Sequence, residues 1–424
     1  MECYGSRDEY YSALEKRALL PLGFRAACVP LSFFPEERAA EHPYDMNLSL
    51  ISLDSPAQAA AGVFTRNSFP GAPVLIARER IGRPSIRGIL INNRIANVCA
   101  PDGVRDAEAV IAELEKISGG GLFLPASTGI IGWRLPVQEM KDALPALVGG
   151  LSDTTILPVA EGIMTTDSYP KIRSAWVGDG RIVGIAKGAG MIEPNMATML
   201  VFILTDISIP GPDLDRACRD IAGRTFNTIT VDSDQSTSDM MMILSSGRTG
   251  PVSPADFHDA LYDVCRHLAA DIVRNGEGTS HVMRVSVTGA PDGETAAGTA
   301  KSVANSPLVK TAVYGNDPNV GRIIMAVGKY AGNGGLALDP GAVTVSLGGR
   351  CVFREGSFRL DGAGEEELAS CLRDAALPEK SPGYPVHDRC VEIEIDLGMG
   401  QAAARAMGSD LSYQYVRENA DYRT

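Results

Sequence analysis

One threonine hydroxyl, that of Thr198, lies where a loop rich in glycine and proline meets an apolar segment. Gly188, Gly190 and Pro194 precede it, and glycine admits backbone conformations that are closed to other residues. The run Met199–Leu204 follows and predicts a buried strand, although its pattern alone does not exclude a buried helical turn. A rigid element beside a loop is a suitable place for a reactive group. A threonine at the start of a strand is also an ordinary structural residue, so the pattern by itself leaves both roles open.

The residue before Thr198 is Ala197, whose small side chain leaves its carbonyl open to attack. If the Thr198 hydroxyl attacked this carbonyl, the chain would break and the new α-amino group would lie beside the hydroxyl. An α-amine has a pKa near ~7.7–8.0, whereas a lysine amine at ~10.4 is mostly protonated at neutral pH. The α-amine could therefore act as the general base that an alcohol nucleophile needs.

The stretch KGAGMIEPNMATML, from Lys187 to Leu200, resembles the self-cleavage site of the ornithine acetyltransferase family, also called bifunctional glutamate N-acetyltransferases. The family's scissile bond corresponds to Ala197–Thr198, and the resemblance runs from Phe24 to Thr424. It implies cleavage into two chains, 1–197 and 198–424, that stay associated as a heterotetramer. Residues 1–22 are an extension, in which a helix over Tyr10–Leu20 would form a mobile arm or an oligomer contact.

The same resemblance implies the reaction. Acetyl would pass from N-acetylornithine to Thr198 and then to glutamate, in two half-reactions of arginine biosynthesis. Acetyl-CoA would be a second donor if the enzyme is bifunctional. Neither half-reaction needs a metal or an organic cofactor.

A second polar motif, Ser127-Thr128-Gly129, follows a short predicted strand at 122–125. Acyl transfer through a tetrahedral intermediate needs donors for the developing oxyanion. Backbone N–H groups near Gly129 and the Thr128 hydroxyl could supply them, although the same letters suit a plain turn. The family's oxyanion hole falls on this Thr-Gly pair, so the resemblance implies that role for Thr128 and Gly129.

The resemblance implies further substrate contacts beside Thr198. Each has an ordinary structural interpretation, such as a capped strand end, a solvated lysine, an exposed turn or a frayed terminus. A lysine could neutralise a substrate carboxylate, and a glutamate between two glycines suits a protonated α-amine. The residues concerned are Thr165, Lys187, Glu277, Asn419 and Thr424.

Two positions depart from the family pattern. Arg94-Ile95 stands where the family usually has Gly-Asn, which puts the shape of that loop in question. Glu193, close before the nucleophile, would favour a cationic amine over a dicarboxylate, or would point to water. These departures keep open an acyltransferase of the same fold that acts on another amine in specialised metabolism. The sequence is also compatible with an amidohydrolase that uses an N-terminal threonine, and with a non-catalytic relative that stays uncleaved.

Composition narrows the class of protein. The 424 residues carry a formal charge of −13, which argues against nucleic acid and against an anionic membrane as partners. The eight cysteines lack CxxC spacing, so reduced thiols in the cytoplasm are expected and a zinc site is not. The cluster Asp232–Asp239 lacks the glycine and the later glutamate of a calcium loop. No apolar run reaches the ~18–20 residues of a membrane span.

The elements that must position these residues indicate an α/β fold. We expect mixed sheets flanked by helices, in an α-β-β-α-type sandwich core with a second, smaller domain. Residues Ala107, Val110, Ile111, Leu114 and Ile117 form one stripe of a surface helix that would begin after Asp102. Further helices are predicted at 212–226, 254–275 and 297–306, and strands at 47–53, 61–67, 89–92, 228–231, 282–288, 342–347, 350–354 and 391–396, with a hairpin at 176–186.

Overall fold

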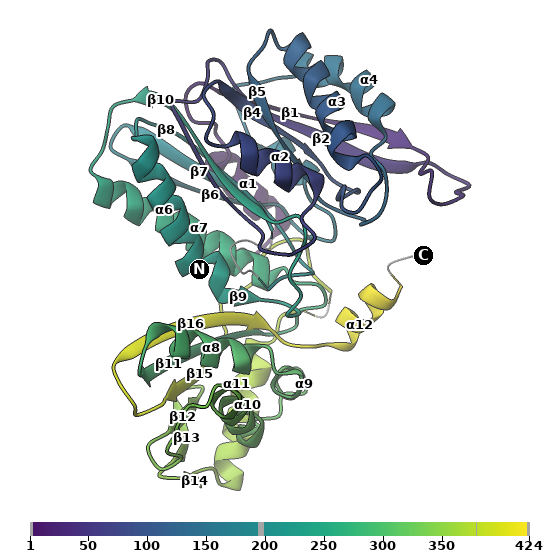
Figure 1. The fold of residues 1–424 in the computed structure, drawn as a ribbon. Helices are drawn as coiled ribbons and strands as arrows, with labels where there is room; N and C mark the ends of the chain where they lie inside the picture. The colour runs from purple at the N-terminus through teal and green to yellow at the C-terminus, as the bar shows by residue number, and fades with distance from the viewer. Residues whose placement is uncertain (1–2, 194–198, 379, 422–424) are drawn as a thin grey trace.

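The computed structural model describes residues 3–193, 199–378 and 380–421, so Ala197, Thr198 and Thr424 lie outside the described residues. The chain forms two units, which Figure 1 shows one above the other. The larger unit holds two sheets. The first sheet has the order β1 (Phe24–Phe33), β2 (Tyr44–Leu53), β4 (Ile86–Asn92), β5 (Leu122–Ser127). The second has the order β3 (Ala59–Phe64), β10 (Met240–Thr249), β8 (Leu200–Ile207), β7 (Gly180–Lys187), β6 (Lys171–Val177).

The two sheets pack face to face between two layers of helices, as the α-β-β-α prediction requires. Helices α3 (Gly103–Ile117) and α4 (Val137–Gly149) share a core cluster with the outer face of the first sheet. Helices α6 (Gly211–Arg224) and α7 (Pro254–Arg274) cover the outer face of the second. Residues of both sheets form the cluster between them. Helices α2 (Ala72–Arg80) and α5 (Leu157–Gly162) pack at the margins of this sandwich.

Strand β8 confirms the prediction for 199–204, because every one of its residues is buried. Val201 and Ile203 face the helices α6 and α7, whereas Phe202 and Leu204 face the first sheet. Complete burial of such a side chain contributes roughly 1.5–3 kcal/mol. A strand with two apolar faces explains why its sequence is a continuous run without alternation.

The predicted apolar stripe of α3 is confirmed in four of its members, and the helix begins directly after Asp102. Asp102 is therefore the N-cap residue, as predicted, but its side chain does not cap the helix. Asp102 has φ of +58° and makes no capping hydrogen bond; its carboxylate forms an ion pair with Arg105 at 2.8 Å. An exposed pair of this kind contributes at most about 1 kcal/mol.

The smaller unit is built on the third sheet and is the second domain that the sequence predicts. Its strand order is β14 (Ser357–Phe358), β13 (Arg350–Arg354), β12 (Thr344–Leu347), β15 (Val391–Asp396), β11 (Val282–Ala290), β16 (Ala402–Ser409), β9 (Ile229–Thr230). Helices α8 (Gly293–Ala304), α9 (Pro307–Tyr314), α10 (Val320–Asn333) and α11 (Gly362–Ala375) complete its core. Helix α12 (Tyr413–Ala420) then leaves the smaller unit and, in Figure 1, projects to the right near the level where the two units meet.

The N-terminal extension is docked, so its interpretation as a mobile arm is wrong. Helix α1 spans Arg7–Arg17 and begins three residues before the predicted position. Tyr10 and Leu14 are at most 2% exposed, and the Tyr10 hydroxyl donates to the carbonyl of Pro170 at 2.5 Å. In the described part of the chain, no helix has the length and apolarity to cross a membrane.

Candidate active site

A buried network around Asp167 connects several of the predicted site segments. Its carboxylate accepts hydrogen bonds from Lys171 Nζ at 2.5 Å, from the N–H of Gly188 at 2.9 Å and from the N–H of Thr165 at 3.1 Å. Lys171 Nζ also donates to Asn275 Oδ1 at 2.7 Å. The network therefore fixes Thr165, the start of the loop that follows β7 and the end of α7 relative to one another. We call this loop, which begins at Lys187-Gly188-Ala189-Gly190, the KGAG loop.

The electrostatics of this network follow from its burial. The side chains of Asp167 and Lys171 are both 0% exposed. Burial alone would raise the pKa of Asp167, but the charges of Lys171 and Lys187 and the hydrogen bonds from Lys171 and Gly188 lower it to about 2. The carboxylate is ionised at neutral pH and holds its donors through charge-assisted hydrogen bonds.

Glu277 lies on the loop after α7 and contacts two other candidate segments. Its N–H donates to the carbonyl of Ala189 at 2.8 Å, and its carboxylate accepts from Asn419 Nδ2 at 2.9 Å. A Cβ at Gly190 would lie 2.3–2.5 Å from the carboxylate atoms of Glu277. Only glycine at position 190 leaves room for the carboxylate in this position. The KGAG loop, the loop that carries Glu277 and helix α12 therefore meet here.

Lys187 ends β7 and lies opposite Leu200 in the register of β7 and β8. Leu200 is the second residue after Thr198 in sequence. Within the described ranges, no hydrogen bond or ion pair engages Lys187 Nζ, and its side chain is half-buried. A lysine of this kind is available to a substrate carboxylate.

Thr128 and Gly129 lie in the loop after β5, and this loop packs on the loop after β4. The N–H of Thr128 donates to the carbonyl of Asn92 at 3.1 Å. Gly129 has φ of +131°, and a Cβ there would lie 2.1 Å from the carbonyl carbon of Arg94. Both the backbone conformation and this close approach require glycine. The N–H of Gly129 makes no hydrogen bond to any described residue, so it is available as an oxyanion donor.

Arg94, where the family usually has glycine, adopts φ of +69°. This left-handed conformation costs a side-chain-bearing residue roughly 1–2 kcal/mol. Its guanidinium donates from Nε to the carbonyl of Asp45 at 3.0 Å, which holds the side chain away from Gly129. Arg94 thus adopts a left-handed conformation that glycine would adopt without strain. The loop that carries Arg94 also contacts the residue before Thr165, because Asn93 Nδ2 donates to the carbonyl of Met164 at 3.1 Å.

Glu193 does not point to water. Its carboxylate forms an ion pair with Lys301 Nζ of α8 at 3.3 Å, and the two side chains are 23% and 17% exposed. Lys301 also donates to the carbonyl of Ile229 at 2.7 Å. The charge of Glu193 is therefore compensated from the smaller unit.

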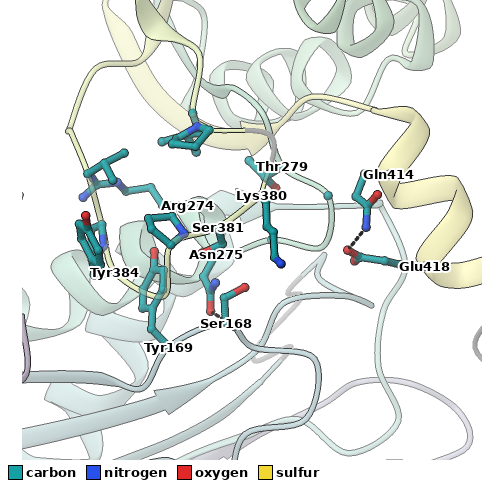
Figure 2. A pocket seen from close by; sticks show the side chains of 17 residues that line it. Ser168, Tyr169, Arg274, Asn275, Thr279, Lys380, Ser381, Tyr384, Gln414 and Glu418 are labelled. Carbon is teal, nitrogen blue, oxygen red and sulfur yellow. Dashed lines mark hydrogen bonds between the residues drawn. The ribbon is translucent and has the colours of Figure 1, made fainter. Parts of the chain in front are cut away.

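A cavity of about 520 Å³ adjoins these residues. It is bounded by Gly276 and Gly278 on either side of Glu277, by Gln414 and Glu418 of α12, and by the irregular segment after α11. Figure 2 shows Lys380 of that segment between Asn275 and α12, where Gln414 donates to Glu418 at 2.7 Å. The cavity gives a small molecule an approach to the loop that carries Glu277.

The structure thus joins four predicted substrate contacts, Thr165, Lys187, Glu277 and Asn419, to one connected set of loops, and it links Thr128 and Gly129 to that set through residues 92–95. The described residues do not include Ala197, Thr198 or Thr424, for which the predicted roles stay predictions. Sequence reasoning missed Asp167, Lys171 and Asn275 as positioning residues. The sequence signals were the i, i+4 spacing of an acid and a lysine, which is common on surfaces, and the place of Asp167 and Lys171 in a segment that resembles the family.

Comparison with known proteins supplies the family. The ArgJ family model matches residues 38–424. The arginine biosynthesis bifunctional protein ArgJ of Nitratidesulfovibrio vulgaris is 39% identical over 416 residues, which cover 95% of this chain and 99% of that one. The protein of the same name from Thermosynechococcus vestitus is 39% identical over 425 residues, covering 95% and 96%.

Two solved structures are also similar. The structure of an arginine biosynthesis bifunctional protein ArgJ from Bacillus halodurans has 35% identity and a TM-score of 0.45, covering 52% of this chain and 98% of that one. An ornithine acetyltransferase complexed with ornithine, from Mycobacterium tuberculosis, has 33% identity and a TM-score of 0.34, covering 43% and 96%.

Proposed function

The chain belongs to the ArgJ family, and on that basis we propose that it is an acetyltransferase of arginine biosynthesis that moves an acetyl group from N-acetylornithine to glutamate. The observation that carries the proposal is the meeting of Glu277, Gly190 and Asn419. Glu277 and Asn419 are 142 positions apart in sequence, yet their side chains are joined at 2.9 Å beside the KGAG loop.

The first step is self-cleavage between Ala197 and Thr198. The Thr198 hydroxyl adds to the Ala197 carbonyl, the C–N bond breaks and an ester forms, which water then hydrolyses. The products are chains 1–197 and 198–424, and the second begins with a free α-amine. The anchoring of Gly188 by Asp167, and of Ala189 by Glu277, supports this step because it fixes the approach to the bond.

In the transfer reaction, the Thr198 hydroxyl attacks the acetyl carbonyl of N-acetylornithine while the α-amine accepts its proton. Thr128 and the N–H of Gly129 stabilise the oxyanion. Ornithine leaves with the returned proton, and the acetyl group remains on Thr198 as an ester. The amine of glutamate then attacks this ester and regenerates the hydroxyl, so the reaction is a ping-pong mechanism. Acetyl-CoA is an additional acetyl donor in this scheme.

The substrate contacts divide by charge. Lys187 binds the substrate carboxylate, and Glu277 binds the cationic amine, oriented by Asn419. Thr165, held at its N–H by Asp167 at 3.1 Å, and Thr424 complete the set.

The rival function, transfer to a different amine, rests largely on Glu193. The ion pair to Lys301 at 3.3 Å compensates that carboxylate, so it adds no net negative charge against a dicarboxylate. The proposal for glutamate as acceptor is favoured for this reason. We place the enzyme in the cytoplasm, as a heterotetramer of two cleaved pairs.

Denaturing mass spectrometry of the purified protein tests the cleavage. Two chains that meet between residues 197 and 198 are expected, whereas an intact mass of 44.9 kDa would overturn the proposal. Incubation with N-acetylornithine and glutamate then tests the transfer. Formation of N-acetylglutamate is expected; free acetate without an amine acceptor would instead indicate an amidohydrolase.

A further inference from the structure

The carboxylate of Asp232 is the point at which the KGAG loop is fastened to the body of the protein. Asp232 follows β9 and accepts hydrogen bonds from two consecutive backbone N–H groups, that of Met191 at 2.6 Å and that of Ile192 at 2.8 Å. The N–H of the preceding residue, Val231, donates to the carbonyl of Ile192 at 2.7 Å. Hydrogen bonds from backbone N–H groups to a carboxylate are stronger than those between neutral groups.

The loop conformation at this point needs such an anchor. Met191 has φ of +56°, a left-handed conformation that a methionine rarely adopts. Two N–H groups that point to one side are the usual consequence of such a turn, and they form a small anion-binding concavity. Asp232 fills this concavity from within the chain. The loop therefore arrives at residue 193 with its direction set.

The same carboxylate also holds α12. Tyr415 donates its hydroxyl to Asp232 Oδ2, the oxygen that accepts from Met191, at 3.2 Å. Burial and the charge of Asp232 raise the pKa of Tyr415, so its hydroxyl stays a donor. Four residues further along α12, Asn419 reaches Glu277.

The segment that carries Asp232 is itself fixed. The buried Lys310 donates from Nζ to the carbonyls of Val231 and Ser409, both at 2.6 Å. Lys310 and Asp234 bring further charges close to Asp232, and the N–H of Asp234 donates to Asp232 Oδ1 at 3.3 Å. The carboxylates of Glu193, Glu277 and Asp410 also face the residues that contact Asp232. Asp232 is thus a rigid acceptor between two segments that belong to different parts of the site.

We propose that Asp232 is a positioning residue that sets the segment before the Ala197–Thr198 bond for self-cleavage and, through Tyr415, sets α12 for substrate binding. The proposal rests on the proposed function and assigns to Asp232 no contact with substrate. It separates two effects. Loss of the carboxylate disturbs both cleavage and binding, whereas loss of the tyrosine hydroxyl disturbs binding alone.

The test follows the full chain made by cell-free translation in the cold and then warmed, with cleavage followed on denaturing gels. For Asp232→Asn, cleavage is expected to slow by at least about tenfold, because the neutral side chain holds the two N–H groups less firmly. Asp232→Glu is expected to restore part of the rate. Tyr415→Phe is expected to cleave at the wild-type rate, while the KM of its mature form for N-acetylornithine rises several-fold with little change in kcat.

The matched control is Asp361→Asn. Asp361 caps α11 by accepting a hydrogen bond from the N–H of Gly364 at 2.8 Å. The variant therefore loses a similar hydrogen bond between a backbone N–H and a carboxylate, at a place distant from the site. Its cleavage rate should equal that of the wild type. Cleavage of folded Asp232→Asn at the wild-type rate, or an unchanged KM in Tyr415→Phe, would overturn the inference. If Asp232→Asn does not fold, Asp232→Glu and Tyr415→Phe decide. Failure of the wild type itself to cleave would instead overturn the proposed function.

Discussion

The carboxylate of Glu277 lies directly against the Cα of Gly190, where a Cβ would meet it at 2.3–2.5 Å. Because the obstructing atoms are the end of a flexible side chain, Gly190→Ala should fold normally and displace the carboxylate. We expect the KM for N-acetylornithine to rise about tenfold, since the displaced group no longer meets the amine. Gly250→Ala, where an added Cβ has open space, is the control. An unchanged KM in Gly190→Ala would show that Glu277 does not bind the amine.

The ion pair between Lys301 and Glu193 predicts a change of specificity. Lys301→Met leaves a partly buried carboxylate uncompensated, at a cost of about 1–3 kcal/mol. Its negative charge should raise the KM for glutamate more than the KM for N-acetylornithine. The double variant with Glu193→Gln removes the charge and should restore both values. Steady-state kinetics with each substrate varied in turn measure the effect, and equal changes in both KM values would contradict it.

Asp167 predicts how stability depends on pH. Its folded-state pKa of about 2 lies below the ordinary value of 3.8. Between these values the unfolded chain binds more protons, so the stabilisation is complete above about pH 4 and is lost as pH falls toward 2. The loss should amount to about 2 kcal/mol. Urea unfolding across this range should show a wild-type advantage over Asp167→Asn that shrinks with falling pH; a constant difference would contradict the assignment.

The docking of α1 predicts a stability role for the extension. Tyr10→Phe removes the hydroxyl that donates to Pro170 and leaves a buried carbonyl unsatisfied. We expect a loss of about 1–2 kcal/mol in the free energy of unfolding. Tyr11→Phe, on the same helix, is the control because Tyr11 is only partly buried. Denaturant titration compares them, and equal midpoints would mean that α1 contributes little through this contact.

The elements that can be predicted from sequence are those whose pattern is local. The stripe of α3 and the continuous apolar run of β8 depend on spacing within one segment, and both are found. Strand β10 is absent from the predicted strands, although Met240 to Leu244 are fully buried. Its continuous apolar run follows the Ser- and Asp-rich cluster Asp232–Asp239, which is the same kind of local pattern that predicts β8. The omission of β10 is therefore an error of the prediction, whereas its place between β3 and β8 comes only from the structure.

The residues of the site also divide into those that the sequence predicts and those that it does not. The candidate residues Thr165, Lys187, Glu277 and Asn419 belong to motifs that resemble a known family, and periodicity does not single them out. The residues that hold those motifs in place could not be predicted, because their decisive contacts join segments far apart in the chain. Asp167 is linked through Lys171 to Asn275, and Asp232 contacts the KGAG loop and α12. Asp232 and Tyr415, for example, are 183 positions apart. The left-handed backbone of Arg94 is equally invisible in a sequence that shows arginine.

The position of β8 determines whether cleaved fragments can exchange between molecules. In the second sheet, β10 and β8 lie between β3 on one side and β7 and β6 on the other. If the chain is cut before β8, two strands of the later fragment are enclosed by strands of the earlier one. Exchange of fragments between molecules would require melting the sheet. When two alleles are expressed in one cell, each fragment should therefore stay paired with the fragment from its own precursor chain, and no mixed pairs should form.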